Sequence, residues 1–302
     1  MSRLAFPALL AVLLAQQATL RVEVALVTVG VRVSDSHGGE IRGLTAGDFM
    51  LFEDGKRREI AVFSNEEWPI SLEILLDRSD SMAAGGKLER AKEAVQLLVR
   101  SSHTGTEFLY LPFDANLPRA RNFIAERAVV ESLISATEPG SGTCLYDAVI
   151  EGLRRCSAAR LHRQAVVLVT DGADQHSSHK LDEVIAEVQE ARAHLYAIAY
   201  FAPNEYELFQ SSGTKITLVS GWEIDNPRIV FQRLAKESGA VAYFPKSDGE
   251  MRRAVEEIAS DLRLQYTIAF YPPKEEKGTY HRLEVKVKRS GARVRARPGY
   301  TR

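Results

Sequence analysis

The sequence predicts an α/β fold, a doubly wound and mostly parallel sheet with helices on both faces, plus a small all-β sandwich-like unit from the N- and C-terminal segments. Three observations lead to this prediction. Between residues 69 and 261, short apolar runs typical of buried strands alternate with amphipathic helical patterns. Before and after that stretch, the patterns are almost entirely those of strands. The 302 residues, of which 45% are hydrophobic, suffice for about two domains.

The first 18 residues resemble a secretory signal peptide. Residues 4–15 form an apolar run after Arg3 that is too short to span a bilayer, which takes about 20 residues. We expect cleavage near Ala15 or Ala18, no transmembrane span in the mature chain, and export to the periplasm, the cell envelope or the medium. An ordinary apolar first strand or helix is the alternative.

Residues 19–68 predict the first half of the β unit. Residues 20–34 are rich in valine and alternate with period two, as one long strand or two. A short capped helical turn is expected near residues 45–48, and Asp54-Gly55 marks a hairpin turn between apolar runs. Residues 262–302 predict the second half, with strands at 264–273, 280–289 and 292–300. Because each half is too small to bury a core alone, we expect the two to pair.

Residues 69–261 predict the parallel sheet and its helices, since such strands are buried on both faces and joined by helical crossovers. Strands are expected at 70–76, 107–113, 164–170, 195–201 and 240–244, and helices at 87–101, 144–156, 180–192, 226–239 and 249–262. The loop over 202–225 is too long for a simple connection. Its aromatic side chains Tyr206, Phe209 and Trp222 suit either a partner surface or packing against the sheet rim.

Charge and cysteine content narrow the function classes. Lys and Arg number 39 against 40 Asp and Glu, so no basic stripe for nucleic acid is expected. Cys144 and Cys156 fall in one helical pattern, where twelve residues rise about 18 Å, too far for a disulfide. We therefore expect no disulfide framework and no nucleic-acid partner.

Hydroxyl and carboxylate side chains gather where the predicted parallel strands end. Asp77, Ser79 and Ser81 follow the first of these strands, and an extended segment would point all three to one side. Asp171 follows the third strand, and Thr143 lies in the loop that enters a helix. Ligands of open α/β sheets bind at this edge. Two carboxylates and three hydroxyls suit a hard divalent cation such as Mg²⁺, with a coordination position free for an outside carboxylate or water.

These residues resemble the metal-ion-dependent adhesion site of von Willebrand factor A-type domains. The segments GLTAGDFMLFEDGK, TCLYDAV and RARPGY are similar to a bacterial, usually exported, family related to these domains. The resemblance implies that residues 69–261 form the A-type domain and that Ser79, Ser81 and Thr143 contact Mg²⁺, Mn²⁺ or Ca²⁺. Asp77 and Asp171 would bind directly or through water. It also implies a non-enzymatic module that binds an Asp or Glu carboxylate of a partner protein. Asp80 departs from the commoner glycine and adds negative charge.

Other interpretations of the same residues remain open. A Mg²⁺-dependent phosphatase-like hydrolase could use Asp77 as its nucleophile, although a second acid two residues later is missing. A scaffold with a vestigial site is the third interpretation, and Ser and Asp after strands are often turn or cap residues. Asp147 is expected to be structural. Solvated loop positions are expected for Asp114, Asp174, His176 and His179. For Asp114 and Asp174, the alternative is that they support the metal ligands from behind.

Overall fold

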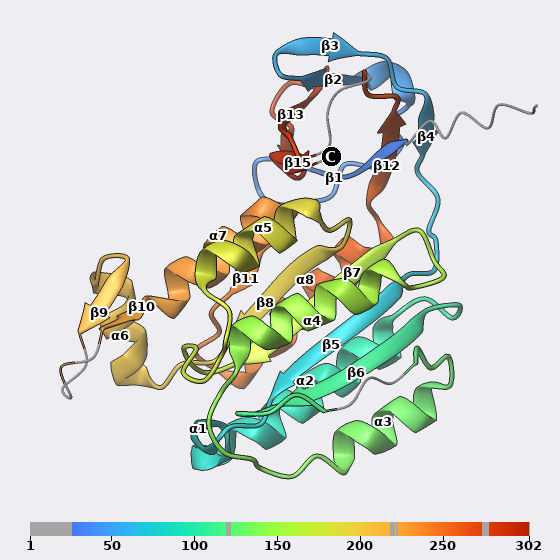
Figure 1. The fold of residues 1–302 in the computed structure, drawn as a ribbon. Helices are drawn as coiled ribbons and strands as arrows, with labels where there is room; N and C mark the ends of the chain where they lie inside the picture. The colour runs from blue at the N-terminus through green and yellow to red at the C-terminus, as the bar shows by residue number, and fades with distance from the viewer. Residues whose placement is uncertain (1–25, 119–121, 218–220, 222, 274–277, 302) are drawn as a thin grey trace, which may run out of the picture.

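The structure is a computed structural model that describes residues 26–118, 122–217, 221, 223–273 and 278–301. An α/β unit fills its lower part and a smaller β unit lies above it (Figure 1). The expected leader at residues 1–18 lies outside the described residues. In the described part of the chain, no helix is both long and apolar enough to cross a bilayer.

The α/β unit is built on one five-stranded sheet in which all neighbours are parallel. Its strand order is β11 (Ala242–Tyr243), β8 (His194–Ala199), β7 (Gln164–Thr170), β5 (Ser71–Asp77) and β6 (Glu107–Phe113). Every residue of β5 is buried, as a strand covered on both faces requires. The predicted parallel sheet is therefore confirmed.

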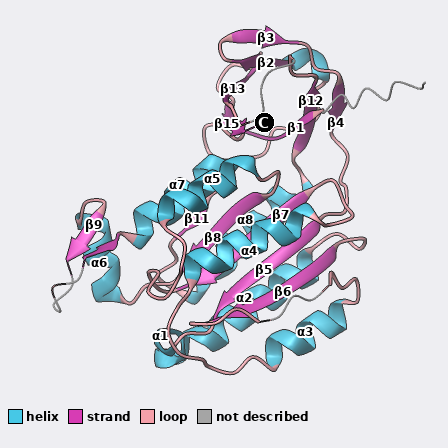
Figure 2. Cartoon of the chain, viewed as in Figure 1, coloured by secondary structure: helices cyan, strands magenta, loops and turns pink. Residues whose placement is uncertain are grey.

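Helices cover both faces of this sheet (Figure 2). One face packs against apolar side chains of α2 (Lys87–Ser101), α3 (Arg127–Ser135) and α8 (Asp248–Arg263). The other packs against α4 (Leu145–Ser157), α5 (Leu181–Glu190) and α7 (Pro227–Ser238). Apolar residues at helical spacing turn one side of each helix to the sheet, which buries it and excludes water.

The β unit consists of two antiparallel sheets made from both ends of the chain. One contains β14 (Arg293–Arg295), β1 (Val27–Ser34), β12 (Tyr266–Phe270) and β4 (Val62–Ser64), and the other β15 (Gly299–Thr301), β13 (Tyr280–Val287), β2 (Phe49–Glu53) and β3 (Lys56–Arg58). Their inner faces share one apolar core, with Val31 and Phe270 from the first sheet and Leu51 from the second. The predicted pairing of the terminal segments into a sandwich-like unit is confirmed.

Polar contacts join the two units at the end of the sheet away from the strands' carboxyl ends. Asp261 of α8 pairs with Arg295 of β14 and lies 3.2 Å from Arg32 of β1. Buried Arg297 donates to the carbonyl oxygens of Gln189 and Ala191 at 2.6 and 2.9 Å. The β unit is thus fixed opposite the edge at which the candidate site lies (Figure 1).

Several elements were not predicted. They are the short helix α1 (Asp80–Ala83), the 3-10 turn η2 (Ala84–Gly86), helix α3, and α6 (Pro203–Ser211), β9 (Lys215–Thr217) and β10 (Glu223–Asp225) within the loop over 202–225. That loop contributes to the core, because Phe209 is buried with its ring centroid 4.8 Å from that of Phe201. Tyr206 is half-buried, and Trp222 lies outside the described residues.

Candidate functional site

The parallel sheet brings the predicted residues to one edge. Asp77 is the last residue of β5, Ser79 precedes α1, and Asp171 follows β7 directly. Ser81 lies inside α1, so the expected extended segment is wrong, because the chain turns helical at Asp80. Thr143 lies in the loop before α4.

Hydrogen bonds link four of the five residues into a chain. The Ser81 hydroxyl donates to Asp171 Oδ1 at 2.7 Å, and the Ser79 and Ser81 Oγ atoms are 3.1 Å apart. The backbone nitrogen of Ser79 donates to Asp77 Oδ1 at 2.9 Å. Of these five residues, Ser81 is exposed and the other four are buried, so solvent reaches the cluster at the Ser81 hydroxyl.

Asp77 is the most deeply held member of the group. It is 0% exposed, and its second oxygen accepts a 2.6 Å hydrogen bond from the Thr170 hydroxyl. Burial raises the pKa of Asp77 to about 6, although the hydrogen bonds from Thr170 and Ser79 oppose that rise. A nearby cation would favour its charged form.

Thr143 is positioned through its backbone. Its amide donates to His176 Nδ1 at 3.2 Å, and its carbonyl accepts from the amides of Gln175 and His176. Among the described residues, no hydrogen bond joins its hydroxyl to the other four. The preceding Gly142, at φ +66°, donates to Asp80 Oδ2 at 3.1 Å. Asp80 therefore ties the Thr143 loop to α1, a role that the sequence did not indicate.

Lys87, the first residue of α2, brings a positive charge to the site. Its Nζ lies 2.5 Å from Asp171 Oδ2 and 3.9 Å from Glu205 Oε2, and its side chain is 12% exposed. Both oxygens of Asp171 are thus engaged, one by Ser81 and one by this ammonium. In the sequence, Lys87 was predicted only as the first residue of a helix. Its position directly after Gly85-Gly86, at the helix start near the carboxyl edge, could have indicated that it reaches the site.

The neighbouring loops are tied by polar contacts rather than solvated. Buried Asp114 accepts from Arg78 at 2.6 Å, and His179 Nδ1 lies 2.7 Å from Asp147 Oδ1. The expectation of solvated positions is therefore wrong for Asp114 and His179. It is also wrong for Asp174, which accepts from the Ser177 hydroxyl. His176 is exposed, as expected, although its Nδ1 accepts from the Thr143 amide.

The donor set fits a hard divalent cation. The five side chains offer only oxygen atoms, and the ammonium on Asp171 shows that this edge attracts positive charge. In the described part of the chain, no three His, Cys, Asp or Glu side chains converge, so hydroxyls would have to complete the set. Asp77 and Asp171 together would balance the charge of a divalent ion.

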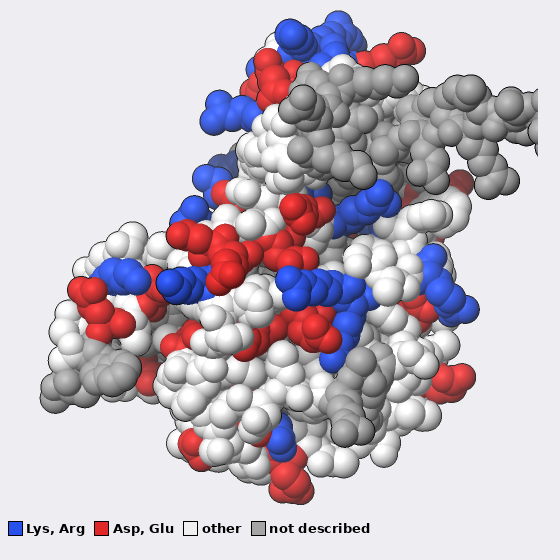
Figure 3. All heavy atoms as spheres, viewed as in Figure 1, with Lys and Arg blue, Asp and Glu red and all other residues white. Residues whose placement is uncertain are grey.

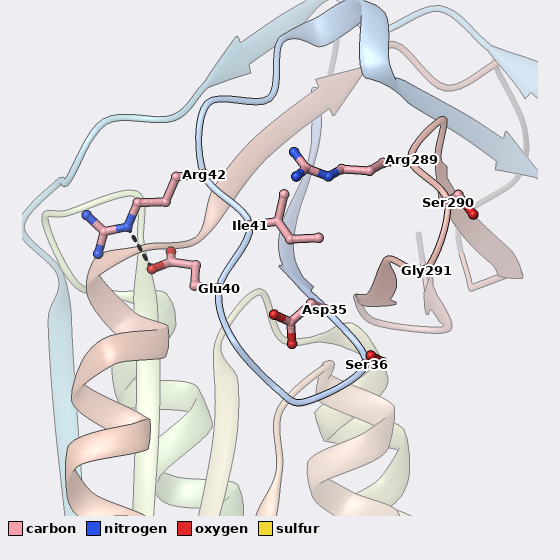
Figure 4. Close-up of a pocket in the computed structure, with 8 residues that line it drawn as sticks. All are labelled: Asp35, Ser36, Glu40, Ile41, Arg42, Arg289, Ser290 and Gly291. Carbon is pink, nitrogen blue, oxygen red and sulfur yellow. Dashed lines mark hydrogen bonds and ion pairs between the residues drawn. The ribbon is translucent and has the colours of Figure 1, made fainter.

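A separate pocket of about 370 Å³ lies in the β unit and contains none of these residues (Figure 4). Two of its charged side chains are engaged locally, since Arg42 Nε lies 2.9 Å from Glu40 and Asp35 accepts hydrogen bonds from two backbone amides. On the face drawn in Figure 3, acidic and basic side chains are interspersed over the α/β unit. Neither this pocket nor this surface brings together a set of metal-binding side chains like the one at the sheet edge.

In a comparison with known protein families, residues 72–173 match the model of the von Willebrand factor type A domain. A von Willebrand factor type A structure from Catenulispora acidiphila is similar at 12% identity, with a TM-score of 0.51 over 84% of this chain and 73% of that one. Proximal thread matrix protein 1 of the mussel byssus, with a zinc-occupied MIDAS motif, is similar at 15% identity and a TM-score of 0.51, over 71% of this chain and 50% of that one. Such identities show the fold alone. No curated protein sequence matched.

Proposed function

Because the chain contains a von Willebrand factor type A domain, we propose that it is a metal-dependent protein-binding module. Asp77, Ser79, Ser81, Thr143 and Asp171 would hold a divalent cation, with Mg²⁺ as the first candidate and Mn²⁺ or Ca²⁺ as alternatives. A partner protein would bind through an Asp or Glu carboxylate. The observation that supports this most is the hydrogen-bonded chain from Asp77 to Asp171 at the carboxyl edge.

Some of the site's residues would supply charge to the cation, and others would hold the ligands in position. Asp77 and Asp171 supply two negative charges, while the hydroxyls are neutral donors that leave the bound ion electrophilic. The ion would supply a Lewis-acid position for the partner's carboxylate. Asp80 ties the Thr143 loop to α1, and His176 ties it to the loop after β7. Ser81 provides the exposed side from which a partner can approach.

Thermal unfolding with and without Mg²⁺ tests this proposal. An ion that binds only the folded state stabilises it by about 2.7 kcal/mol at one hundred times its Kd, a Tm rise of several degrees. The double variant Ser79→Ala with Asp171→Ala should lose this rise. The matched control, Ser157→Ala with Asp182→Ala, removes the same chemical groups away from the site and should keep it. An equal Mg²⁺ effect in both double variants would refute the site.

The hydrolase alternative gains little support from the position of Asp77. A nucleophile must reach its substrate, but Asp77 is fully buried with both oxygens hydrogen-bonded. We expect no turnover of a generic phosphate ester in Mg²⁺. Turnover that Asp77→Asn abolishes would favour the hydrolase over the binding module.

We also propose export of the chain, from the sequence of residues 1–18 alone. N-terminal sequencing of the protein from fractionated cells should find a mature start near residue 16 or 19 in an envelope or extracellular fraction. An intact Met1 in the cytoplasmic fraction would contradict it.

A further inference from the structure

A second pocket, of about 500 Å³, adjoins the candidate metal site. Its lining residues come from α6, the residues after β8, η2 and the start of α2, at the carboxyl edge of the sheet. We call it the basic–aromatic pocket, and its chemistry is set by Lys87, Arg90, Tyr200, Tyr206, Glu207 and Lys246. Lys87 belongs to both sites, since its ammonium contacts Asp171 while its side chain lines the pocket.

The pocket carries more positive charge than its own acids neutralise. Of the six side chains, three are cations and only Glu207 is an acid. Lys87 is already paired with Asp171 and lies 3.9 Å from Glu205, so the charge open to a ligand is that of Lys246 and Arg90. In the described part of the chain, Lys246 makes no ion pair, and its Nζ lies 3.8 Å from the Tyr206 ring centroid. Arg90 lies over Tyr200 at 5.4 Å, and its carboxylate neighbour, Asp248, is 3.6 Å away and 78% exposed. An anionic ligand is the complement of this arrangement.

The two tyrosine rings add an apolar wall to that charge. Tyr200 and Tyr206 are half-buried, and the cations lie over their faces. An acidic side chain can place its methylene stem against such rings while its carboxylate meets Arg90 or Lys246.

We propose that the basic–aromatic pocket binds a second acidic side chain of the partner, on the same segment that supplies the carboxylate at the metal site. This inference rests on the proposed function and adds to it the class of partner, a segment with at least two neighbouring acidic residues. The pocket would then discriminate between partners that share a single acidic residue.

An array of pentapeptides tests the proposal. Each peptide has a fixed central Asp, and each flanking position carries Glu, Gln or Lys in turn. The full chain is applied in Mg²⁺ and in EDTA, as wild type, Lys246→Gln and the matched control Lys236→Gln on α7. We expect Glu at one or more flanking positions to raise binding about threefold to tenfold over Gln. Lys246→Gln should reduce this preference and the control should keep it.

The outcomes separate this inference from the proposed function. Mg²⁺-dependent binding without a preference for flanking Glu overturns the pocket proposal alone. The pocket proposal is also overturned if the preference for flanking Glu survives in Lys246→Gln, or if Lys236→Gln reduces it equally. A preference that Lys246→Gln removes but EDTA does not affect supports the pocket and contradicts the metal-dependent function. No binding of any peptide contradicts both.

Discussion

At the scale of single residues, Lys87 holds the position of a cation on Asp171. Its Nζ is 2.5 Å from an oxygen that a metal ion would also use. A divalent ion must therefore compete with a tethered ammonium whose local concentration is high. Lys87 should lower metal affinity and, in the absence of metal, stabilise the buried carboxylate.

Replacing Lys87 by methionine should separate these two effects. We expect Lys87→Met to bind Mg²⁺ about tenfold more tightly, because the competing charge is gone, and to unfold at a lower temperature without metal. Isothermal titration and thermal unfolding measure the two quantities. Lys92→Met is the control, since Lys92 lies on the same helix, is similarly buried and pairs with Glu89 instead. Unchanged or weaker Mg²⁺ binding in Lys87→Met would contradict the account.

Glu73 is a buried acid outside the candidate site. It lies in β5 and is 0% exposed, and within the described ranges its carboxyl oxygens have no hydrogen-bond partner beyond the weak contact with the neighbouring Cys156 thiol. Burial raises the pKa of Glu73 well above its ordinary value, against a smaller opposing effect of Arg155. The folded protein therefore keeps this proton at pH values where the unfolded chain has released it.

The resulting pH dependence has a definite sign. Because the folded state binds the proton more tightly, Glu73 destabilises the fold progressively as pH rises above about 4.5, up to its raised pKa. Glu73→Leu removes both this effect and an unpaired polar group, and should raise the free energy of unfolding by about 1–3 kcal/mol near neutral pH. The gain should shrink as pH falls toward 4.5. Urea unfolding across that range measures it, and a constant or reversed difference would contradict the argument.

At the scale of elements, the link between α1 and the Thr143 loop depends on Asp80. Asp80→Ala removes the acceptor for the Gly142 amide and should weaken Mg²⁺ binding about fivefold, the equivalent of about 1 kcal/mol for one hydrogen bond. Asp80→Asn keeps an acceptor oxygen without the charge. Titration calorimetry should show near wild-type affinity for Asp80→Asn. Equal losses in both variants would mean that charge, and not loop position, is what Asp80 contributes.

The buried strands and the longer helices could be predicted, and the short elements could not. Strand β6 lies at the predicted residues 107–113, because an apolar run of that length is a strong signal. Helix α3 was missed because only Val130 and Ile134 are buried in its nine residues, which leaves a weak periodic pattern. Helix α1 has four residues and depends on the contacts of its loop more than on propensity.

The meeting of the site residues at one edge of the sheet was predictable for a similar reason. Parallel strands place their carboxyl ends at one edge, so Asp77 and Asp171 had to meet there once β5 and β7 were recognised. The contacts of Lys87, Asp80 and His176 were not predictable, because they join loops whose conformations depend on the packed whole.

At the scale of the whole molecule, the β unit is coupled to the α/β unit through buried Arg297. Arg297→Ala leaves the carbonyls of Gln189, Ala191 and Gly299 without this donor and should lower the free energy of unfolding by about 1–3 kcal/mol. Mg²⁺ affinity should stay unchanged, since the candidate site lies at the opposite end. Arg154→Ala, on the exposed side of α4, is the control. Urea unfolding measures the loss of stability and Mg²⁺ titration measures the affinity. A large loss of Mg²⁺ affinity in Arg297→Ala would contradict the independence of the metal site from this contact.

The proposed metal site places a divalent cation between Asp77, Ser79, Ser81, Thr143 and Asp171 at the carboxyl edge of the sheet. Crystals grown with Mn²⁺ and measured at the manganese absorption edge test it most directly. We expect one strong anomalous peak about 2.0–2.3 Å from oxygens of Ser79, Ser81 and Thr143, with Asp77 and Asp171 bound directly or through water. We also expect Lys87 to have withdrawn from Asp171. No peak at this edge, or a peak elsewhere with Lys87 still on Asp171, would contradict the account.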